Sequence, residues 1–276
     1  MTETPAVVTP EMERRLAGTP LVVLLDVDGT LAPIAPRPED AAVPAETRRV
    51  VAALAAREEI HVGLVSGRAA ADARRLVAVE NVHAIGNHGC EVMSPEGAMT
   101  IDPAVAPWRE ALAGAAQALT PRLAAVDGVF LEDKTWTLSI HYRLADPEIL
   151  PRLRGVVTDV AARYGLPVTE GKKVLEVRPP VSVDKGTAVL ALAERLGATG
   201  EHASLLYAGD DRTDEDAFRR LRERLPRAVT VRVAGRGGSE GSGGDDARPD
   251  THAEFVVRDP AEMRELLEWI AAVRRA

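Results

Sequence analysis

The sequence predicts an α/β protein: a parallel, Rossmann-like sheet covered by helices, into which a smaller α+β domain is inserted. Apolar strand-like runs alternate with helical segments before residue 90 and again after residue 184, and such alternation is typical of β-α-β units. Between these regions, a helical segment followed by a pair of strand-like runs occurs twice, which predicts a small antiparallel sheet backed by two helices. The core is therefore assigned to residues 1–105 and 182–276, and the inserted domain to residues 106–181.

The first part of the core is expected to begin with a buried strand in LVVLLDVDGTLAP (21–33), whose apolar run ends at two aspartates. A helix is expected over 45–58, because Val50 and Leu54 recur at helical spacing and Pro44 occupies a position where a helix can begin. The remaining elements of this part are a strand at 60–68, a helix at 69–79 and a strand at 82–89. Ligands of such sheets bind outside the carboxyl ends of the strands. The polar residues at those ends are therefore the candidates for a site.

The inserted domain and the second part of the core follow in the same manner. The inserted domain is expected to hold helices over 106–119 and 147–165 and strand pairs over 128–144 and 166–180. The core then continues with helices over 185–197, 213–224 and 260–275 and strands over 203–211, 228–234 and 253–259. The stretch GRGGSEGSGGDDARPD (235–250) is rich in Gly, Ser and Asp, which favours a flexible linker. A lid over a site has a similar composition.

The composition excludes several classes of function. The 276 residues hold 34 basic and 42 acidic side chains, a net charge of −8, which is unsuited to a general nucleic-acid binder. Three each of Trp, Tyr and Phe are too few for base-stacking platforms. Cys90 is the single cysteine, which excludes an internal disulfide and a cysteine-based metal site. Since no apolar run reaches the roughly 18 residues of a membrane span and the first residues do not resemble a signal peptide, a cytoplasmic protein without a membrane or nucleic-acid partner is expected.

Two groups of aspartates stand where strands of the predicted sheet end. Asp26 and Asp28 follow the first strand, in DVDGT. Asp210 and Asp211 follow a later strand, in YAGDD, and Asp214 stands shortly behind them. An Asp-Gly turn and an acidic helix N-terminus are the plainer explanations. In a parallel sheet, however, Asp26, Asp28 and Asp210 reach one edge, where three carboxylates take up protons unless a cation neutralises them. Mg²⁺, which binds carboxylates together with substrate phosphate, is the expected cation.

Two further residues suit a site that handles phosphate. Ser66 ends the second strand in VSGR, where its hydroxyl and the backbone N–H groups that follow can hold phosphate oxygens. Lys185, in VDKGTAVL, opens a helix, an unusual place for a cation beside the positive end of the helix dipole. A phosphate held by both side chains explains these positions. A helix N-cap at Ser66 and a solvated surface lysine at 185 are the alternatives.

Four stretches resemble, in the same order, the motifs of the haloacid dehalogenase superfamily of phosphatases: DVDGTL, VSGR, DKG and GDDRTDEDAF. The inserted domain between the second and third of them resembles the C2-type cap of that superfamily. More narrowly, GNHG, EDKTWTLSIHYR, GKKVLEVRP and GDDRTDEDAF resemble trehalose-6-phosphate phosphatases. The resemblance implies a haloacid dehalogenase core with a cap, over 106–181, that determines substrate specificity. The stretch 235–250 is longer than the family pattern requires.

The resemblance implies a covalent mechanism for the matching residues. Asp26 would attack phosphorus and form an aspartyl phosphate. Asp28 would protonate the departing sugar oxygen and then accept a proton from the hydrolytic water. Ser66 and Lys185 would bind the oxygens of the transferring phosphoryl group. The residues implied for Mg²⁺ are Asp26 through its carboxylate, Asp28 through its backbone carbonyl, and Asp210, with Asp211 and Asp214 orienting bound waters.

Candidate substrate ligands come from the core motifs and from the cap. In GKKVLEVRP, Lys172, Glu176 and Arg178 share one face of a strand, because residues two apart point the same way. The solvent-facing side of a half-buried strand has the same pattern, but the resemblance favours Lys172 and Glu176 as sugar ligands. The full set of candidates is Thr30, Gly67, Arg68, His88, Glu132, Lys134, Arg143, Lys172 and Glu176.

The reaction that the resemblance implies is Mg²⁺-dependent hydrolysis of trehalose 6-phosphate to trehalose and inorganic phosphate. A phosphatase for another sugar phosphate, of the sucrose or glucosylglycerol phosphate type, has the same core. A phosphomutase shares both the core and the cap type, and a regulatory sugar-phosphate binding protein would lack turnover. The intact pair of Asp26 and Asp28 argues against the last alternative. The sequence carries no signal for association with a separate trehalose-6-phosphate synthase.

Overall fold

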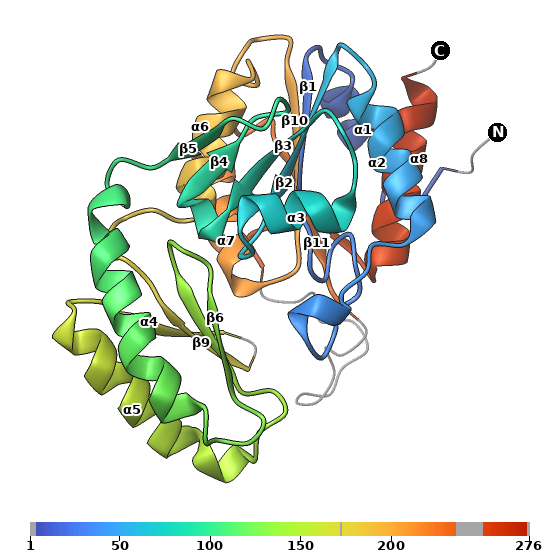
Figure 1. Ribbon diagram of the computed structural model, residues 1–276. Helices are drawn as coiled ribbons and strands as arrows, with labels where there is room; N and C mark the ends of the chain where they lie inside the picture. The colour runs from blue at the N-terminus through green and yellow to red at the C-terminus, as the bar shows by residue number, and fades with distance from the viewer. Residues whose placement is uncertain (1–3, 172, 236–250, 275–276) are drawn as a thin grey trace. The chain divides into compact units, whose positions relative to one another are not determined.

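The computed structural model describes residues 4–171, 173–235 and 251–274 (Figure 1). The chain divides into two compact units, one made of Met1–Thr100 and Asp184–Ala276 and the other of Ile101–Val183. Each unit is built on one sheet. Lys172 lies outside the described residues, and so does the predicted linker at 235–250 except for Gly235.

The larger unit carries the predicted parallel sheet. Its strands are β1 (Leu21–Asp26), β2 (Ile60–Val65), β3 (Val82–Gly86), β4 (Glu91–Met93), β5 (Met99–Ile101), β10 (Ser204–Gly209), β11 (Val229–Val233) and β12 (Phe255–Val257). Over the described residues their order is β12-β11-β10-β1-β2-β3-β4-β5. Strands from β12 to β3 are parallel neighbours, and β4 is antiparallel to β3. The predicted α/β core is confirmed, whereas β4 and β5, with three residues each, are too short to show a period in the sequence.

Helices cover both faces of this sheet. They are α1 (Pro10–Leu16), α2 (Ala45–Ala55), α3 (Ala70–Val77), α6 (Lys185–Arg195), α7 (Arg212–Arg224) and α8 (Pro260–Val273), with 3₁₀ turns at Pro38–Asp40 and Asn87–Gly89. Leu21, Val23 and Leu25 of β1 pack toward α1, α2, α3 and α8, whereas Val22 and Leu24 pack toward α6 and α7 (Figure 1). A strand buried on both faces is apolar throughout, so its first polar side chain comes at its end. Among the described residues, no helix combines the length and apolar character needed to cross a lipid bilayer.

The helices α6 and α7 begin at aspartates that cap them. Asp184 accepts a hydrogen bond from the N–H of Thr187 at 2.8 Å, and the hydroxyl of Thr187 accepts one from the N–H of Asp184 at 3.0 Å. Asp211 caps α7 by accepting the N–H of Asp214 at 3.1 Å. Such reciprocal caps fix the first turn of a helix. The cap at Asp184 therefore holds Lys185 at the start of α6.

The smaller unit is an antiparallel sheet with helices on one face. Its elements are α4 (Arg109–Leu123), β6 (Phe130–Asp133), β7 (Leu138–His141), α5 (Leu150–Arg163), β8 (Val168–Gly171) and β9 (Val174–Val177), with 3₁₀ turns at Ala106–Trp108 and Pro147–Ile149. The strand order is β6-β7-β9-β8. The side chains that pack against α4 and α5 are Leu138, Ile140, Leu175 and Val177. Alternation then directs Glu132, Ser139 and Glu176, which are cross-strand neighbours, to the opposite face.

Candidate active site

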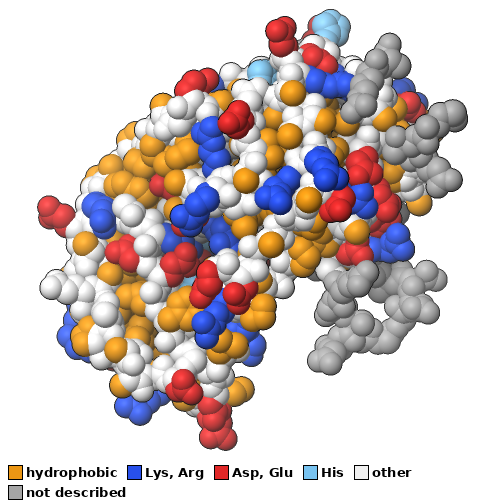
Figure 2. Space-filling view, turned by 45° about the vertical axis from the view of Figure 1, so that its right-hand side comes forward, with side chains coloured by type: hydrophobic (Ala, Val, Ile, Leu, Met, Phe, Trp, Pro, Cys, Tyr) orange, Lys and Arg blue, Asp and Glu red, His pale blue; other side chains and the backbone are white. Residues whose placement is uncertain are grey.

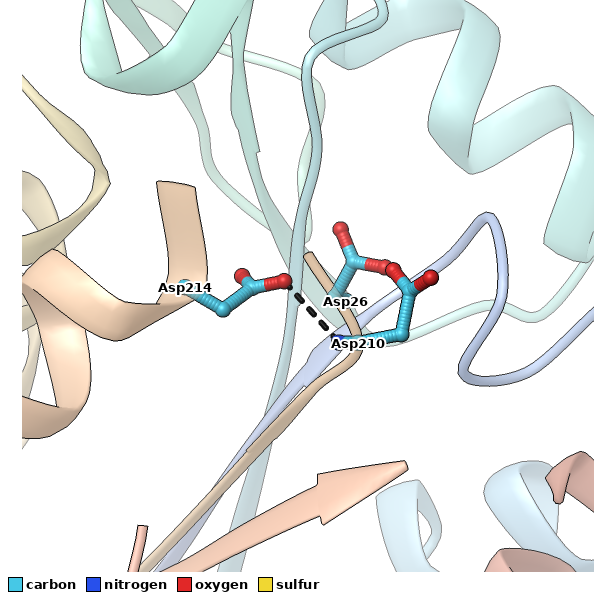
Figure 3. Close-up of side chains that lie close together, drawn as sticks. All are labelled: Asp26, Asp210 and Asp214. Carbon is cyan, nitrogen blue, oxygen red and sulfur yellow. Dashed lines mark hydrogen bonds between the residues drawn. The ribbon is translucent and has the colours of Figure 1, made fainter. Parts of the chain in front are cut away.

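The carboxyl edge of the larger sheet gathers the predicted aspartates. β1 and β10 are parallel neighbours, with Leu25 opposite Ala208, so Asp26 at the end of β1 meets Asp210, which follows β10. Asp214, from the first turn of α7, joins them (Figure 3). One carboxylate oxygen of each of these three aspartates lies within 4.8 Å of the others. The fold thereby brings residues from both halves of the core into one acidic group.

Asp26 is a buried carboxylate with unequal oxygens. It is 4% exposed, and its Oδ1 accepts a hydrogen bond from Nζ of Lys185 at 2.7 Å. Its Oδ2 is buried and accepts no hydrogen bond from any described residue. Burial raises the pKa of Asp26 well above its usual range, against the lowering effect of Lys185 and with a further increase from Asp214 and Asp210. The buried oxygen without a donor is an acceptor that a ligand can use.

Asp214 organises the group around it. Its Oδ1 accepts hydrogen bonds from Nζ of Lys185 at 2.9 Å and from the hydroxyl of Tyr207 at 2.5 Å. Its Oδ2 accepts the backbone N–H groups of Asp210 and Asp211, both at 3.0 Å. A carboxylate has about four acceptor sites, so these donors fill them. Burial raises the pKa of Asp214 to about 7, although Lys185 opposes the rise.

Lys185 is the cation that holds this acidic group together. Its side chain is 1% exposed and its Nζ lies 3.8 Å from Oδ1 of Asp211, in addition to its bonds with Asp26 and Asp214. Burial lowers the pKa of Lys185, but the three carboxylates outweigh burial and raise it well above the usual range. For Asp211 the effects have the opposite sign: burial raises its pKa, but Lys185 and a hydrogen bond from Thr213 outweigh burial, so the pKa is lowered. Lys185 is thus a buried ammonium and not the solvated surface lysine of the alternative interpretation.

The acidic group fits a divalent cation. Oδ2 of Asp26 is buried without a donor, and the carboxylate of Asp210, 6% exposed, lies beside it (Figure 3). Carboxylate oxygens are the ligands that Mg²⁺ prefers. A cation here would relieve the repulsion by Asp214 and Asp210, which adds to the effect of burial in raising the pKa of Asp26. Asp26 and Asp210 are the side chains best suited to hold it, because the acceptor sites of Asp214 are filled from within the protein.

Asp28 stands apart from this group and is paired with Arg68. Nε of Arg68 donates to Oδ2 of Asp28 at 2.6 Å, and Nη2 donates to Oδ1 at 2.8 Å. Gly29 follows Asp28 in the turn and has a φ of +94°, and a β-carbon there would lie 2.2 Å from Oδ2 of Asp210. Only glycine combines that backbone with that space. Thr30 follows in the turn and is fully buried.

The ends of β2 and β3 add Ser66, Gly67 and His88. Ser66 is 1% exposed, and its Oγ accepts the N–H of Arg68 at 3.1 Å. The N–H of His88 donates to the carbonyl of Ser66 at 3.1 Å. A β-carbon on Gly67 would lie 2.6 Å from the imidazole of His88, so glycine allows this close approach. Asn87 and His88 have φ values of 51° and 55°, a region that non-glycine residues occupy at an energetic cost and that is common at functional sites.

Three of the remaining candidates, Glu132, Lys134 and Glu176, lie on the polar face of the smaller sheet. Nζ of Lys134 is 3.5 Å from Oε1 of Glu176, and the Oγ of Ser139 donates to the same oxygen at 3.3 Å. Nε of Arg178 donates to Oε2 of Glu176 at 2.8 Å. Glu132, on the neighbouring strand, is 2.8 Å from Nε2 of His141. The candidate Arg143, beyond β7, is exposed. The predicted sugar ligands Glu132, Lys134 and Glu176 therefore share one sheet face.

Comparison with known families agrees with this arrangement. Residues 24–248 match the model of the trehalose-phosphatase family. The chain belongs to the trehalose-phosphatase family. The matched region includes the acidic group, Lys185, the whole smaller sheet, and the larger sheet apart from β12 and the first residues of β1; α8 also lies beyond its end. The haloacid dehalogenase fold expected from the motifs is that of this family and is confirmed.

Individual relatives match this chain over most of its length. Trehalose-phosphate phosphatase B of Arabidopsis thaliana is 32% identical over 275 residues, which cover 96% of this chain and 70% of the plant protein. An uncharacterized glycosyl hydrolase of Mycobacterium tuberculosis is 37% identical over 215 residues, 77% of this chain, although these span only 16% of that relative's length. The solved C-terminal domain of the C. albicans trehalose-6-phosphate phosphatase superposes with a TM-score of 0.74 at 25% identity, covering 98% of this chain and 99% of that domain.

Two residues that support the trehalose-phosphatase site were not among the sequence candidates. Tyr207 is fully buried inside β10 and donates to Asp214; in an apolar strand it looks like a core residue, and only its hydroxyl is a signal. Glu91, 5% exposed, accepts the N–H of Ala70 at 2.7 Å and the side-chain amide of Asn87 at 3.0 Å. It thereby ties the start of α3 to the turn that carries His88. Burial raises the pKa of Glu91.

Proposed function

We propose that the protein hydrolyses trehalose 6-phosphate to trehalose and inorganic phosphate. The observation that carries this proposal is the buried Asp26, bonded to Lys185 and adjacent to Asp210, in a chain of the trehalose-phosphatase family. The named relatives in Arabidopsis thaliana and C. albicans are phosphatases of trehalose phosphate. The match to this family makes a different sugar phosphate the weaker alternative.

The proposed chemistry has two steps in which Asp26 and Asp28 exchange roles. In the first, a carboxylate oxygen of Asp26 forms a bond to phosphorus while the bond from phosphorus to the sugar oxygen breaks, and the carboxyl of Asp28 gives its proton to that oxygen. In the second, a water oxygen bonds to phosphorus, one proton of the water passes to Asp28, and the bond from phosphorus to Asp26 breaks. Phosphate leaves and both aspartates return to their starting forms.

The surrounding residues would stabilise charge and fix geometry, which phosphoryl transfer requires above all. Lys185 is suited to the phosphoryl oxygens because its raised pKa keeps it cationic. Ser66, Gly67 and Thr30 stand at the same strand ends and would donate hydrogen bonds to the phosphoryl group. A bound Mg²⁺ would supply charge neutralisation at the phosphoryl oxygens. We assign its direct ligands to Asp26, the backbone carbonyl of Asp28 and Asp210, with Asp211 and Asp214 holding the surrounding structure in place.

We assign sugar recognition to the smaller unit. Sugar hydroxyls pair well with charged side chains, and the polar sheet face presents Glu176 with Lys134 and Arg178 around it. The proposed sugar ligands are Glu132, Lys134, Arg143, Lys172 and Glu176, together with His88 of the larger unit. In this proposal the unit Ile101–Val183 is the cap that determines specificity.

Replacing Glu176 by glutamine is expected to lower kcat/KM for trehalose 6-phosphate about 10- to 100-fold, because a hydrogen bond to a charged group is worth about 1.5–3 kcal/mol. The rate with p-nitrophenyl phosphate, which has no sugar, should change less than about threefold on the same reasoning. Glu170→Gln is the matched control, since Glu170 lies on β8 of the same sheet and binds Tyr142 and Arg154 instead. Equal losses with both substrates would contradict a role in sugar recognition.

The proposed function is tested by measuring phosphate release from a panel of sugar phosphates. The panel holds trehalose 6-phosphate, sucrose 6-phosphate, glucose 6-phosphate and glucosylglycerol phosphate. Strong preference for trehalose 6-phosphate is the expected result. Preference for another member rejects the substrate assignment and keeps the core chemistry, whereas product analysis that finds the phosphoryl group moved on the sugar indicates a mutase. Absence of any turnover rejects the proposal.

We propose that this reaction takes place in the cytoplasm with a small-molecule partner. Cys90 is buried and is the single cysteine, so the chain holds no internal disulfide, as suits a reducing compartment. The net charge is −8, and basic and acidic side chains are interspersed on the face seen in Figure 2. Local charge at the strand ends, and not an overall field, would therefore attract the anionic substrate.

A further inference from the structure

The carboxylate of Asp28 needs support from outside its own turn. The backbone of the turn is well held, since the N–H of Gly29 donates to the carbonyl of Ala32 at 2.7 Å and the N–H of Ala32 donates to Val27 at 2.9 Å. The side chain of Asp28, however, is 34% exposed. A fixed backbone leaves a short, partly exposed side chain a choice of staggered rotamers. Proton transfer to a leaving oxygen requires one of them, because donor and acceptor must come within hydrogen-bond distance.

Arg68 supplies that support with both arms of its guanidinium group. Nε and Nη2 bind the two oxygens of Asp28 at 2.6 and 2.8 Å. A planar, two-pronged contact of this kind fixes direction as well as distance, which a lysine cannot do.

Arg68 is itself anchored at three points. Its Nη2 also donates to the carbonyl of Pro38 at 3.0 Å. Its backbone N–H donates to Oγ of Ser66 at 3.1 Å, and its carbonyl accepts the N–H of Asn87 at 2.7 Å. The side chain is 16% exposed. The support for Asp28 is therefore held at both its backbone and its guanidinium end.

We propose that Arg68 is a positioning residue that holds the carboxylate of Asp28 in the orientation used for proton transfer, and that it acts through Asp28 and not as a ligand of the phosphoryl group. This inference rests on the proposed function. The edge of the guanidinium group formed by Nε and Nη2 faces Asp28, so the same edge is not presented to a phosphate. The sequence, in contrast, places Arg68, which is close to Ser66 in VSGR, among the residues predicted to bind the substrate directly.

The test compares leaving groups. A sugar alkoxide needs a proton to leave, whereas p-nitrophenolate does not, so a defect in proton donation slows formation of the aspartyl phosphate only with the sugar substrate. The comparison uses kcat/KM, which does not include the later hydrolysis of the aspartyl phosphate, a step that both substrates share. Arg68→Ala is expected to lower kcat/KM for trehalose 6-phosphate about 100-fold or more, with less than about a tenfold loss for p-nitrophenyl phosphate. Asp28→Asn should show the same pattern, and the double variant should be no worse than Asp28→Asn alone, because residues that act as a unit are not additive. Arg68→Lys should fail to restore activity, since it lacks the two-pronged contact.

Arg15 provides the matched control. Nη1 of Arg15 binds both carboxylate oxygens of Glu254, at 2.8 and 2.7 Å, and the side chain is 10% exposed. It also binds the carbonyl of Arg227 at 3.0 Å, near the amino ends of the strands and so at the opposite edge of the sheet. Arg15→Ala is expected to lower the unfolding temperature and to leave the ratio of the two kcat/KM values as in the wild type.

Three kinetic results would overturn the inference. Equal losses of kcat/KM with both substrates indicate a general structural role, equal losses that come from a raised KM with unchanged kcat indicate a phosphate ligand, and additive losses in the double variant separate Arg68 from Asp28. Crystal structures of the wild type and of Arg68→Ala provide a measurement that does not depend on turnover. They should show Asp28 ordered in the first and displaced or disordered in the second, and an unmoved Asp28 would reject the positioning role. Failure of the wild type to hydrolyse trehalose 6-phosphate would reject the proposed substrate instead.

Discussion

Replacement of Asp26 by asparagine is expected to lower turnover at least about 10⁴-fold, because removal of an attacking group from an active site costs losses of this size or larger. An amide has no negative oxygen to attack phosphorus. The folded state should not suffer in the absence of a cation, since burial raises the pKa of Asp26 and thus disfavours its charged form. In EDTA, the unfolding temperature of the variant is expected to equal or exceed that of the wild type. Phosphate release measures the expected loss of turnover, and thermal unfolding measures the expected effect on stability.

The control for this variant is Asp216→Asn. Asp216 belongs to the same GDDRTDEDAF stretch, but its side chain is 48% exposed and pairs with Arg219 on the surface of α7. It should keep wild-type turnover. Retained turnover in Asp26→Asn would reject the covalent role of Asp26. A large fall in unfolding temperature would show that Asp26 stabilises the fold, contrary to the effect of its burial.

Removal of divalent cations is expected to abolish turnover, and added Mg²⁺ to restore it. Without a cation, the buried Asp26 and Asp210 repel each other and the phosphoryl oxygens. Binding should also be visible without substrate: a ligand at 100 times its Kd stabilises the folded state by about 2.7 kcal/mol, which for a unit of this size raises the unfolding temperature by about 5–10 °C. A titration with Mg²⁺ followed by thermal unfolding measures this shift.

The variant Asp210→Asn distinguishes loss of the cation from this site from any other effect of EDTA on the protein. Asp210 is buried beside Asp26, so its amide should reduce the Mg²⁺-dependent shift in unfolding temperature, and Asp216→Asn should not. Full activity in EDTA, or an unchanged shift in Asp210→Asn, would show that this acidic group does not hold the cation.

Much of the fold follows from local patterns because the core strands are buried on both faces. β1 and β10 are continuous apolar runs, with both faces of each strand covered, and such runs are visible in a single sequence. The capped start of α7 is visible in the same way, from an aspartate before a helical pattern. The short strands β4 and β5, at one end of the larger sheet, were missed because their length leaves no period to detect.

The candidate site could be predicted from the sequence only in part, because no single segment of sequence shows which side chains of other strands it contacts. The carboxyl ends of parallel strands coincide, which is sufficient to bring Asp26 and Asp210 together. The partner of Asp28 is different: Arg68 comes from the neighbouring strand end, and its two-pronged contact depends on side-chain direction. Tyr207 illustrates the same limit, since its position in β10 predicts a core residue while its hydroxyl binds Asp214. The alternation of side chains along a strand predicts which face of the sheet a residue lies on. Its contacts with residues of other elements can be identified only from the folded structure.

The pairing of β1 with β10 determines at which stage of protein synthesis the acidic group of Asp26 and Asp210 can form. Leu21 and Ser204 are partners in the sheet, although about 180 residues separate them, and closing so long a loop costs entropy that grows with the logarithm of its length. The compact unit Ile101–Val183 occupies almost half of that loop, so its prior folding shortens the flexible chain that must close. Asp26 leaves the ribosome long before Lys185 and Asp210. A nascent chain therefore carries its reactive carboxylate without the lysine and acidic neighbour that give it a function, and chemistry begins only when the core is whole.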